Sequence, residues 1–438
     1  TFFEAPVLAF FLAYLIRYFD ESAADPGYTL YENANLPIYI FMSVIVAIFM
    51  GLTVSAEEII KDRKILKREA FLNLSWNSYL LSKVIVQFGI SAIQAFTFVL
   101  VGNHITGVKG MFAEYWLMLF TCWAGANVMG LVISDSFKAV VTIYILIPFL
   151  VIPQIILSGV LVKFEKLNPN VSSPVSIPFY GEMITARWGY EALAVKQFRD
   201  NEYERKFYIY DKALSQAKFK KDYLHAEIKG RLESIAADLE RGTMNETSSR
   251  KLKLVYNEFT KQADQTPDLK FGLIDDLKPD KVTSRIITEA LAYNEDVRRY
   301  YVAYSNKAKE RKDALILKLQ SENSKGFLEL RDKYANESLE EFVINKNETE
   351  KIIEYNDEIV QKLDPIYMEP EHNFIKAHFY SPVKRIFGHE TDTYWVNSIV
   401  LWFITLITYF LLYFRVLRKL LESGDRAMGK KHKSSISQ

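Results

Sequence analysis

Long stretches without a charged residue most constrain what this chain can fold into. A bilayer core takes about 20 apolar residues at helical rise, and a single segment satisfies its backbone there only as a helix. Five stretches of that length contain no Asp, Glu, Lys or Arg, namely 33–56, 84–108, 115–134, 139–162 and 393–414. The sequence therefore predicts an integral membrane protein with at least five spanning helices.

A sixth apolar run, 5–16, is shorter. Tyr18 and Phe19 extend it, and Arg17 can reach a lipid headgroup through its aliphatic stem. We interpret it as the first of six spans; the alternative is a helix that lies in the membrane interface.

The composition of the whole chain hides this pattern of spans, because a net charge of +1 and 24% charged residues average an apolar part with a very polar one. This balance gives no bulk attraction to nucleic acid, and the single cysteine, Cys122, excludes a disulfide framework.

Lys and Arg in the short segments predict the orientation. The segment after the second span and the tail after the sixth are rich in both, whereas the loop 21–37 has neither and 102–113 has only Lys109. The positive-inside rule then places both ends in the cytoplasm and the long block 164–390 outside. The sequence starts with Thr1 and has no signal-peptide pattern, so we expect it to be part of a longer polypeptide.

The block before the last span divides into three segments. Residues 164–198 are rich in Pro, Ser and aromatic residues, which favours a re-entrant or interfacial stretch. From 200 to 363, apolar residues recur in steps of three and four, which indicates packed helices that form a hairpin or small bundle, and 365–388 reads as an irregular return. Breaks are expected at Gly242, around 267–279 and at Gly326. The two helical seams are Phe207, Tyr210, Leu214, Ala217, Leu224, Ile228 and Ile235, and Ile287, Ala290, Val297, Tyr301, Tyr304, Ala308 and Leu315.

The sequence thus predicts an all-α fold, in which a six-span transmembrane helical domain carries a helical extracytoplasmic domain between spans five and six. The expected parts are spans one to five at 1–163 with a cytoplasmic helix at 57–71, the re-entrant segment 164–198, the helical domain 199–391, span six at 392–423 and a basic tail at 424–438.

Catalytic chemistry finds little support. The six His residues are scattered, and no HExxH motif or Cys/His cluster supports a zinc site. The run GDRAMGKK at 424–431 comes close to a phosphate loop, but it lacks the Ser or Thr that would bind Mg²⁺, and no strand precedes it. A basic tail near anionic headgroups is the better interpretation. We therefore expect no catalytic residue and no metal site in this chain.

The segment 57–71 carries the sharpest functional signal. Its sequence, EEIIKDRKILKREAF, alternates charged and apolar residues at helical spacing, with Ile59, Leu66 and Ala70 near one stripe. Such a helix can lie on lipid headgroups. Because its acidic residues offset nearly all of its basic charge, a protein partner suits it better than lipid.

This segment resembles a family. DRKILKRE at 62–69, followed by SYLLSK at 78–83, is similar to the acidic-Arg-x-x-apolar-x-Arg-Glu and Ser-Tyr-x-x-x-Lys pattern of G-subfamily ABC exporters, a type-2 exporter class. LSG at 157–159 and WGYEAL at 188–193 resemble the family's Ser-Gly turn and the re-entrant segment after it. The layout of five spans, a large outer loop and a last span is also that of the family.

The chain departs from this family in two ways. Its outer loop is longer, helical and without cysteine, whereas animal members carry disulfides there, which points to a bacterial branch with an added periplasmic domain. The nucleotide-binding domain, which precedes the spans in the family, is not in this sequence, in agreement with a start at Thr1. The resemblance covers about 1–198 and 392–421.

The resemblance implies a mechanism. Two copies, which we expect to be identical, pair around one translocation path. ATP and Mg²⁺ bind to nucleotide-binding domains that are fused upstream or separate. A coupling helix carries their motion to the spans. By position, its residues here are Glu58, Asp62, Arg63, Leu66, Arg68 and Glu69. The second and fifth spans would line the path with Phe41, Met42, Ile45, Phe49, Met50, Thr53, Ile145, Phe149, Ile152 and Gln154; the alternative for each is packing on neighbouring helices or lipid.

Other polar residues inside the spans are Asn127, Gln94 and Gln87. They either contact cargo or form hydrogen bonds between helices. Pro148 and Pro153 remove backbone donors from the fifth span and are expected to kink it.

Three functions stay open at this level. The first is the permease of an ABC exporter in a bacterial inner membrane, which moves an amphipathic or lipid-like cargo outward. The second is a mechanical transducer, whose periplasmic helices act on an envelope partner protein when ATP drives the spans. The third is a scaffold that transports nothing, and the similarity of 62–69 to a coupling helix argues against it.

Overall fold

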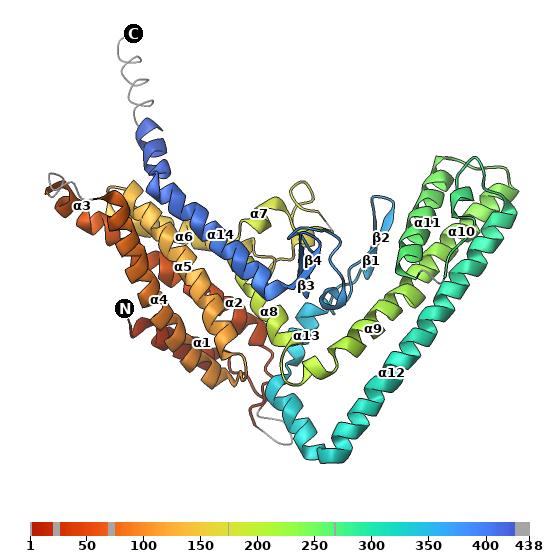
Figure 1. Ribbon diagram of the computed structural model, residues 1–438, viewed down its shortest axis with the longest axis horizontal. Coiled ribbons are helices and arrows are strands. Elements are labelled where there is room, and N and C mark those ends of the chain that lie inside the picture. Colours follow the sequence, from red (N-terminus) through yellow and green to blue (C-terminus); the bar gives the residue numbers. More distant parts are fainter. Residues whose placement is uncertain (1, 21–26, 69–74, 174, 267–268, 425–438) are drawn as a thin grey trace, which may run out of the picture. The chain divides into compact units, whose positions relative to one another are not determined.

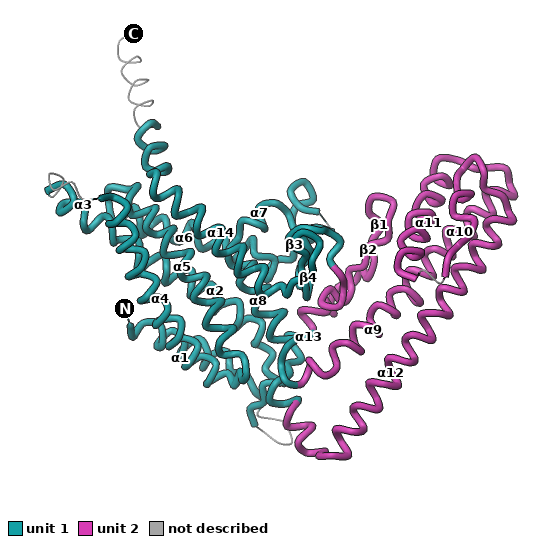
Figure 2. Tube along the Cα trace, viewed as in Figure 1, with its two compact units in different colours: residues 1–202, 331–340, 370–438 teal, residues 203–330, 341–369 magenta. Residues whose placement is uncertain are grey.

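Figure 1 shows the computed structural model of the chain, which describes residues 2–20, 27–68, 75–173, 175–266 and 269–424. The chain divides into two compact units, which Figure 2 colours separately. Unit 1 consists of Thr1–Glu202, Arg331–Glu340 and Pro370–Gln438, and unit 2 consists of Tyr203–Leu330 and Glu341–Glu369. Helices dominate both units, which confirms the predicted all-α class.

Unit 1 is built from apolar helices. They are α1 (Glu4–Ile16), α2 (Leu36–Ser55), α4 (Trp76–Thr106), α5 (Phe112–Ser136), α6 (Val140–Ile156) and α14 (Thr393–Tyr413), with the polar helix α3 (Glu58–Arg68) directly after α2. Within the described residues, four helical stretches are long and apolar enough to cross a membrane: α2 with α3, α4, α5 and α14. Four of the six predicted spans are thus confirmed as helices of spanning length.

The first and fifth predicted spans form shorter helices. α1 has 13 residues and α6 has 17, which is about 20 and 26 Å at helical rise against a hydrocarbon core of about 30 Å. The helix α6 continues through Pro148 and Pro153 and ends before Gly159, whose φ is +79°. A side chain at Gly159 would also lie within 2.4 Å of the Phe164 ring, so the turn requires glycine. The count of six spans stays a prediction.

Small residues bring α2 and α5 close together. A Cβ at Gly51 would lie 2.7 Å from the carbonyl oxygen of Trp123, and a Cβ at Gly130 would lie 2.0 Å from Ser55 Oγ. Glycine at both positions lets the two backbones approach as neighbouring helices do in membranes. Across the next interface, Asn127 of α5 donates from Nδ2 to Ser91 Oγ of α4 at 2.6 Å. For Asn127, the interpretation as a hydrogen bond between helices is therefore confirmed.

The segment after α6 folds back onto these helices. It forms the short helix α7 (Phe179–Glu182) and then α8 (Thr185–Arg199), which contacts α2, α5, α6 and α14 and is buried along nearly its whole length. The strands β3 (Val383–Ile386) and β4 (His389–Asp392) form an antiparallel hairpin just before α14. The prediction of an irregular return over 365–388 was wrong at its end, because Phe387 and Gly388, both with positive φ, make a tight hairpin turn.

Unit 2 is a helical bundle with one further hairpin. Its helices are α9 (Tyr208–Lys218), α10 (His225–Glu240), α11 (Glu246–Gln265) and the greater part of α12 (Ser284–Tyr334), with a π-helical turn at Phe219–Leu224 between α9 and α10. α13 (Glu337–Val343) follows α12. The strands are β1 (Ile352–Tyr355) and β2 (Glu358–Gln361). This hairpin was missed by the expectation of helix up to 363; Asn356 and Asp357, both with positive φ, form its two-residue turn.

The core of unit 2 follows the predicted seams. From the first seam, Phe207, Ala217, Leu224, Ile228 and Ile235 are buried, and from the second, Ile287, Ala290, Val297, Tyr301 and Ala308. Tyr304, in contrast, is 41% exposed.

The predicted helix breaks are confirmed at two of three places. α10 ends just before Gly242, whose φ is +66°, and no helix joins α11 to α12 in the described part of the region 266–283. The third break lies at Asn323 rather than at Gly326, because Asn323 leaves helical geometry and its Oδ1 accepts from the Gly326 N–H at 2.9 Å. Asn323 thus caps the helix that contains Gly326.

Candidate functional site

The helix α3 begins on the last turn of α5, and the two helix ends cap each other. Ser134 Oγ accepts hydrogen bonds from the backbone N–H groups of Ile59 and Ile60, both at 3.0 Å. In return, Arg63 Nη2 donates to the carbonyl oxygens of Ser134 and Asp135, at 3.1 and 2.9 Å. Helix starts leave N–H groups without partners and helix ends leave carbonyl groups without partners. This reciprocal cap satisfies both kinds of group and so fixes α3 on α5.

Ion pairs tie the same helix to α4. Lys83 Nζ lies 2.9 Å from Glu58 Oε2 and 2.9 Å from Asp62 Oδ2. Tyr79, one turn earlier on α4, donates its hydroxyl to Asp62 Oδ2 at 3.0 Å. Asp62 belongs to the first motif of the family pattern, and Tyr79 and Lys83 belong to the second. The two motifs therefore face each other and hold α3 in place.

The end of α5 also faces the chain that follows α14. Asp135 is 3% exposed. Arg418 Nη1 lies 3.4 Å from its Oδ1 and Arg415 Nε lies 3.8 Å from its Oδ2. Helices α3, α4, α5 and the residues after α14 thus share one polar cluster at this end of unit 1, which we call the base cluster: Glu58, Asp62, Arg63, Tyr79, Lys83, Ser134, Asp135, Arg415 and Arg418.

The predicted coupling residues divide between two faces of α3. Glu58, Asp62 and Arg63 lie in the base cluster, and Leu66 is half-buried. Arg68 is exposed, whereas Glu69 lies outside the described residues. The exposed side of the helix, which we call the outer face of α3, consists of Lys61, Lys64, Ile65, Lys67 and Arg68. A partner that contacts α3 therefore meets a basic face with one isoleucine.

The predicted path residues lie on α2 and α6 in different environments. On α2, Phe41, Ile45 and Met50 are buried, Met42 and Thr53 are half-buried and Phe49 is exposed. On α6, Ile145, Phe149 and Ile152 are exposed, and Gln154 is half-buried. The ring of Phe41 packs edge-on against Tyr190 of α8.

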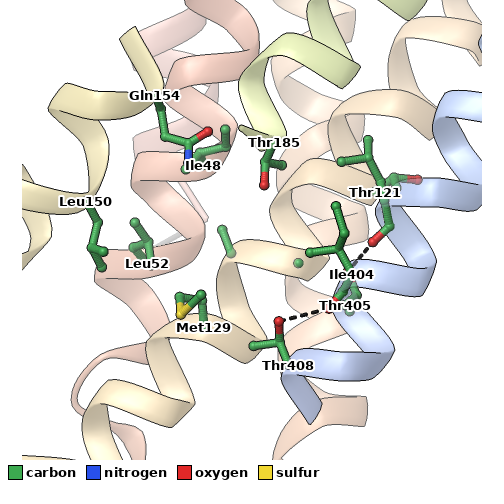
Figure 3. A pocket seen from close by; sticks show the side chains of 13 residues that line it. Ile48, Leu52, Thr121, Met129, Leu150, Gln154, Thr185, Ile404, Thr405 and Thr408 are labelled. Carbon is green, nitrogen blue, oxygen red and sulfur yellow. Dashed lines mark hydrogen bonds between the residues drawn. The ribbon is translucent and has the colours of Figure 1, made fainter. Parts of the chain in front are cut away.

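A cavity of about 90 Å³ lies inside unit 1, between α2, α5, α6, α8 and α14 (Figure 3). Of the predicted path residues only Gln154 lines it. The other lining residues are Ile48, Leu52, Thr121, Gly125, Ala126, Met129, Leu150, Thr185, Leu401, Ile404, Thr405 and Thr408. Sequence reasoning missed them, because apolar and Thr positions in a span carry no mark that separates a cavity wall from ordinary packing.

The helix α8 carries charges into the interior of unit 1. Glu191 Oε2 accepts from Lys384 Nζ of β3 at 2.6 Å and from Asn397 Nδ2 of α14 at 2.9 Å, and Arg187 Nη1 lies 3.2 Å away. Lys384 Nζ also donates to Asn397 Oδ1 at 2.9 Å and lies 4.4 Å from the centre of the Trp188 ring. Buried charges are tolerated when they are paired and hydrogen-bonded in this way. We call Arg187, Glu191, Lys384 and Asn397 the buried charge cluster.

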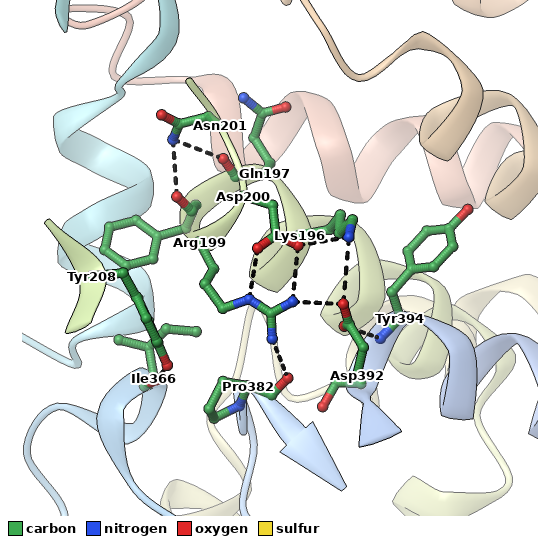
Figure 4. A network of polar contacts seen from close by, with 12 residues as sticks. Lys196, Gln197, Arg199, Asp200, Asn201, Tyr208, Ile366, Pro382, Asp392 and Tyr394 are labelled. Atoms are coloured by element: carbon green, nitrogen blue, oxygen red, sulfur yellow. Dashed lines mark hydrogen bonds and ion pairs between the residues drawn. The ribbon is translucent and has the colours of Figure 1, made fainter. Parts of the chain in front are cut away.

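Ion pairs also hold the place where the chain leaves unit 1 after α8 (Figure 4). Arg199 Nη2 lies 2.5 Å from Asp392 Oδ2, and its Nη1 donates to the Pro382 carbonyl at 2.8 Å. Asp200 pairs with Arg199 and with Lys196, whose Nζ is 2.6 Å from Asp200 Oδ2. Burial alone would raise the pKa of Asp200, but the hydrogen bonds from Arg199 and Lys196 outweigh burial and lower that pKa.

A second attachment lies at the start of α2. Asn336 Nδ2 donates to the carbonyl oxygens of Leu30 and Asn33 at 2.7 and 2.8 Å. The backbone N–H groups of Leu30 and Tyr31 both donate to the Asp332 carbonyl, at 3.0 and 3.3 Å. We call these five residues the α2 clasp. It joins the loop before α2 to the segment 331–340, from which the chain continues into unit 2 in both directions.

Signals for these sites were present in the sequence only in part. Arg187 and Glu191 are charged residues in an otherwise apolar and aromatic run, a pattern that predicts buried charge. Lys384, Asn336 and Ser134 carry no such mark, because their partners come from distant parts of the chain.

Residues 2–198 match the family model of the ABC-2 type transporter membrane domain. No curated protein matches the chain. The match covers α1 to α8 and stops just before the chain enters unit 2. The match supports the interpretation of the chain as an ABC-2 type permease, and hence as the permease component of an ABC transporter. Permeases of this family are not themselves catalytic and normally work with an ABC nucleotide-binding partner.

Proposed function

We propose that this chain is the permease of an ATP-driven exporter that moves an amphipathic or lipid-like cargo outward. The reciprocal cap between α3 and α5 carries the proposal. A permease must receive force from its nucleotide-binding partner, and a helix transmits force only if it is fixed to the helices it drives. Ser134, Arg63 and the pairs of Lys83 fix α3 in this way. The match of residues 2–198 supports the same class.

In this proposal, the partner binds ATP and Mg²⁺ and docks on the outer face of α3, while Glu58, Asp62 and Arg63 hold the helix from within. Unit 2 lies in the periplasm and unit 1 in a bacterial inner membrane. Two copies, most simply identical, enclose the path. The apolar side chains of Phe49, Ile145 and Phe149 support a surface for the second copy, because they are 42%, 59% and 69% exposed on unit 1.

Two α3 variants test the proposal. In proteoliposomes that contain the permease with its nucleotide-binding partner, Arg63→Glu is expected to lose cargo-stimulated ATP hydrolysis and keep normal membrane insertion, because it breaks the reciprocal cap. Ile65→Asp, on the outer face, is expected to reduce co-purification of the partner. Lys109→Ala, which removes a positive charge from an exposed loop, is the control. Unchanged hydrolysis in Arg63→Glu would remove the main support for the coupling role.

A second candidate function is a mechanical transducer that acts on an envelope partner protein through unit 2. The α2 clasp favours it. α2 ends next to α3, and its other end follows Leu30, Tyr31 and Asn33, which bind the segment 331–340. A displacement of α3 along α2 would therefore reach a segment that continues into unit 2.

The two functions differ in what stimulates ATP hydrolysis. Lipid-like cargo stimulates an exporter, whereas a periplasmic protein alone stimulates a transducer. Asn336→Ala separates them further, since it removes two of the four hydrogen bonds of the α2 clasp: a transducer is expected to lose stimulation, and an exporter to retain transport. Asn245→Ala is the matched control, because Asn245 caps α11 within unit 2 and has no part in the clasp.

A further inference from the structure

The cavity inside unit 1 has a polar end and an apolar end. Figure 3 shows Gln154 and Thr185 at one end and Met129 and Thr408 at the other. Its remaining walls are aliphatic, from Ile48, Leu52, Leu150, Leu401 and Ile404. Such a wall suits a hydrocarbon chain, and the polar end suits one polar group at the end of that chain.

The threonine hydroxyls add little polarity along the length of the cavity. Thr121, Thr405 and Thr408 each donate to a carbonyl of their own helix, at 2.8 Å in every case. Each hydroxyl proton is therefore already used, and these residues face the cavity with methyl groups and acceptor lone pairs only. Ordered water needs two to four polar partners of both kinds, which this part of the cavity does not offer.

The polar end offers a donor. Gln154 Oε1 accepts from the backbone N–H of Ala186 at 3.0 Å. This bond fixes the amide plane, and the amide nitrogen can then donate to a carbonyl or carboxylate group. Thr185, which begins α8, lies at the same end and adds a hydroxyl.

The size and access of the cavity fit part of one lipid chain. One water needs about 10–15 Å³ of such volume, so 90 Å³ accommodates about six to nine groups of that size. Met129 is 37% exposed although it lines the cavity, which places an opening at its side chain. In a membrane protein this opening meets acyl chains, and an apolar cavity left empty destabilises the fold.

We propose that this cavity binds the hydrocarbon chain of a single-chain amphiphile, such as a fatty acid, with its carbonyl or carboxylate group at Gln154 and Thr185. The site lies within one copy of the chain and shares only Gln154 with the predicted translocation path. Binding at this site needs neither ATP nor the nucleotide-binding partner. A test of this site is therefore independent of a test of the proposed function.

A photoactivatable fatty acid tests the proposal. The purified full chain in detergent is labelled without nucleotide, and the labelled peptides are mapped by mass spectrometry. We expect labelling of the peptides that contain Met129 and Leu150, and at least a fivefold loss when unlabelled palmitate competes. Labelling confined to the exposed apolar side chains of α14 would overturn the proposal.

Three variants make the test specific. Leu150→Trp fills the cavity and is expected to reduce its labelling at least fivefold, whereas Val141→Trp, on the exposed side of α6 (71% exposed), is expected to leave it unchanged. Leu52→Ala enlarges the cavity and is expected to retain or increase labelling, which keeps the test decisive if Leu150→Trp fails to fold. Equal labelling in Leu150→Trp and Val141→Trp, or its loss in Leu52→Ala, would refute the site.

Discussion

Ser134→Ala is the most direct test of how α3 is held. Ser134 Oγ is the acceptor for two N–H groups at the start of α3, those of Ile59 and Ile60, each at 3.0 Å. Alanine keeps the helix propensity of α5 and removes only this oxygen. The change therefore opens one half of the reciprocal cap and leaves the other half, Arg63, in place.

The magnitude follows from the two lost hydrogen bonds. Replacing a cap residue by alanine costs about 1 kcal/mol, and a buried donor left without a partner costs about 1–3 kcal/mol. Ile59 is 2% exposed, so its N–H gains little from water. We take about 2 kcal/mol for the local stability of the first turn of α3, which corresponds to about a 30-fold change in its opening equilibrium.

Hydrogen–deuterium exchange measures this opening directly. The backbone amides in the first turn of α3 are expected to exchange about 30-fold faster in Ser134→Ala than in the unchanged protein. Ser136→Ala is the matched control, since Ser136 Oγ donates to the Val132 carbonyl of its own helix at 2.7 Å and does not bind α3. Equal exchange of α3 in both variants would show that the cap does not hold the helix.

Three further predictions concern the packing and charges of unit 1. Gly130→Ala is expected to lower the thermal unfolding temperature, at a cost of about 1–3 kcal/mol, because the new Cβ would lie 2.0 Å from Ser55 Oγ; adding Ser55→Ala should recover part of the loss. Glu191→Gln leaves Lys384 in the interior without its carboxylate and is expected to cost about 3–5 kcal/mol, measured by thermal unfolding in detergent, with partial recovery when Lys384→Met is added. Because the pKa of Asp200 is lowered in the folded protein, its carboxylate stabilises the fold above a pH of about 4, and this contribution is lost as the pH falls further. Asp200→Asn should therefore weaken the acid dependence of the unfolding temperature, and an unchanged dependence would contradict the assignment.

The spanning helices could be predicted from the sequence because lipid imposes a simple rule on composition. The rule was less exact for α6, which has 17 residues within an uncharged stretch of 139–162. Its end depends on Gly159 and on the Phe164 ring that packs against it. A search for long apolar stretches does not detect such a turn.

The two hairpins show a different limit. Between IIEY and EIVQ stand Asn356 and Asp357, residue types that tolerate the positive φ of a tight hairpin turn. The signal was therefore present, but the helical seams on either side outweighed it. For the candidate site the limit is distance along the chain. The motifs located α3, yet Ser134, which caps it, is 75 residues after Ile59, and its role depends on how α5 packs.

The exporter and the transducer share one input and differ in where the motion ends. α2 has 20 residues, about 30 Å at helical rise, with α3 directly after it and the α2 clasp directly before it. A helix fixed at both ends transmits a displacement along its axis, provided that its sides do not yield. Most of its length is packed, and glycine contacts bring it close to α5. α2 also borders the cavity, at Ile48 and Leu52. A hydrocarbon chain bound there would support this side of α2, so we expect either function to depend on the lipid that surrounds the protein.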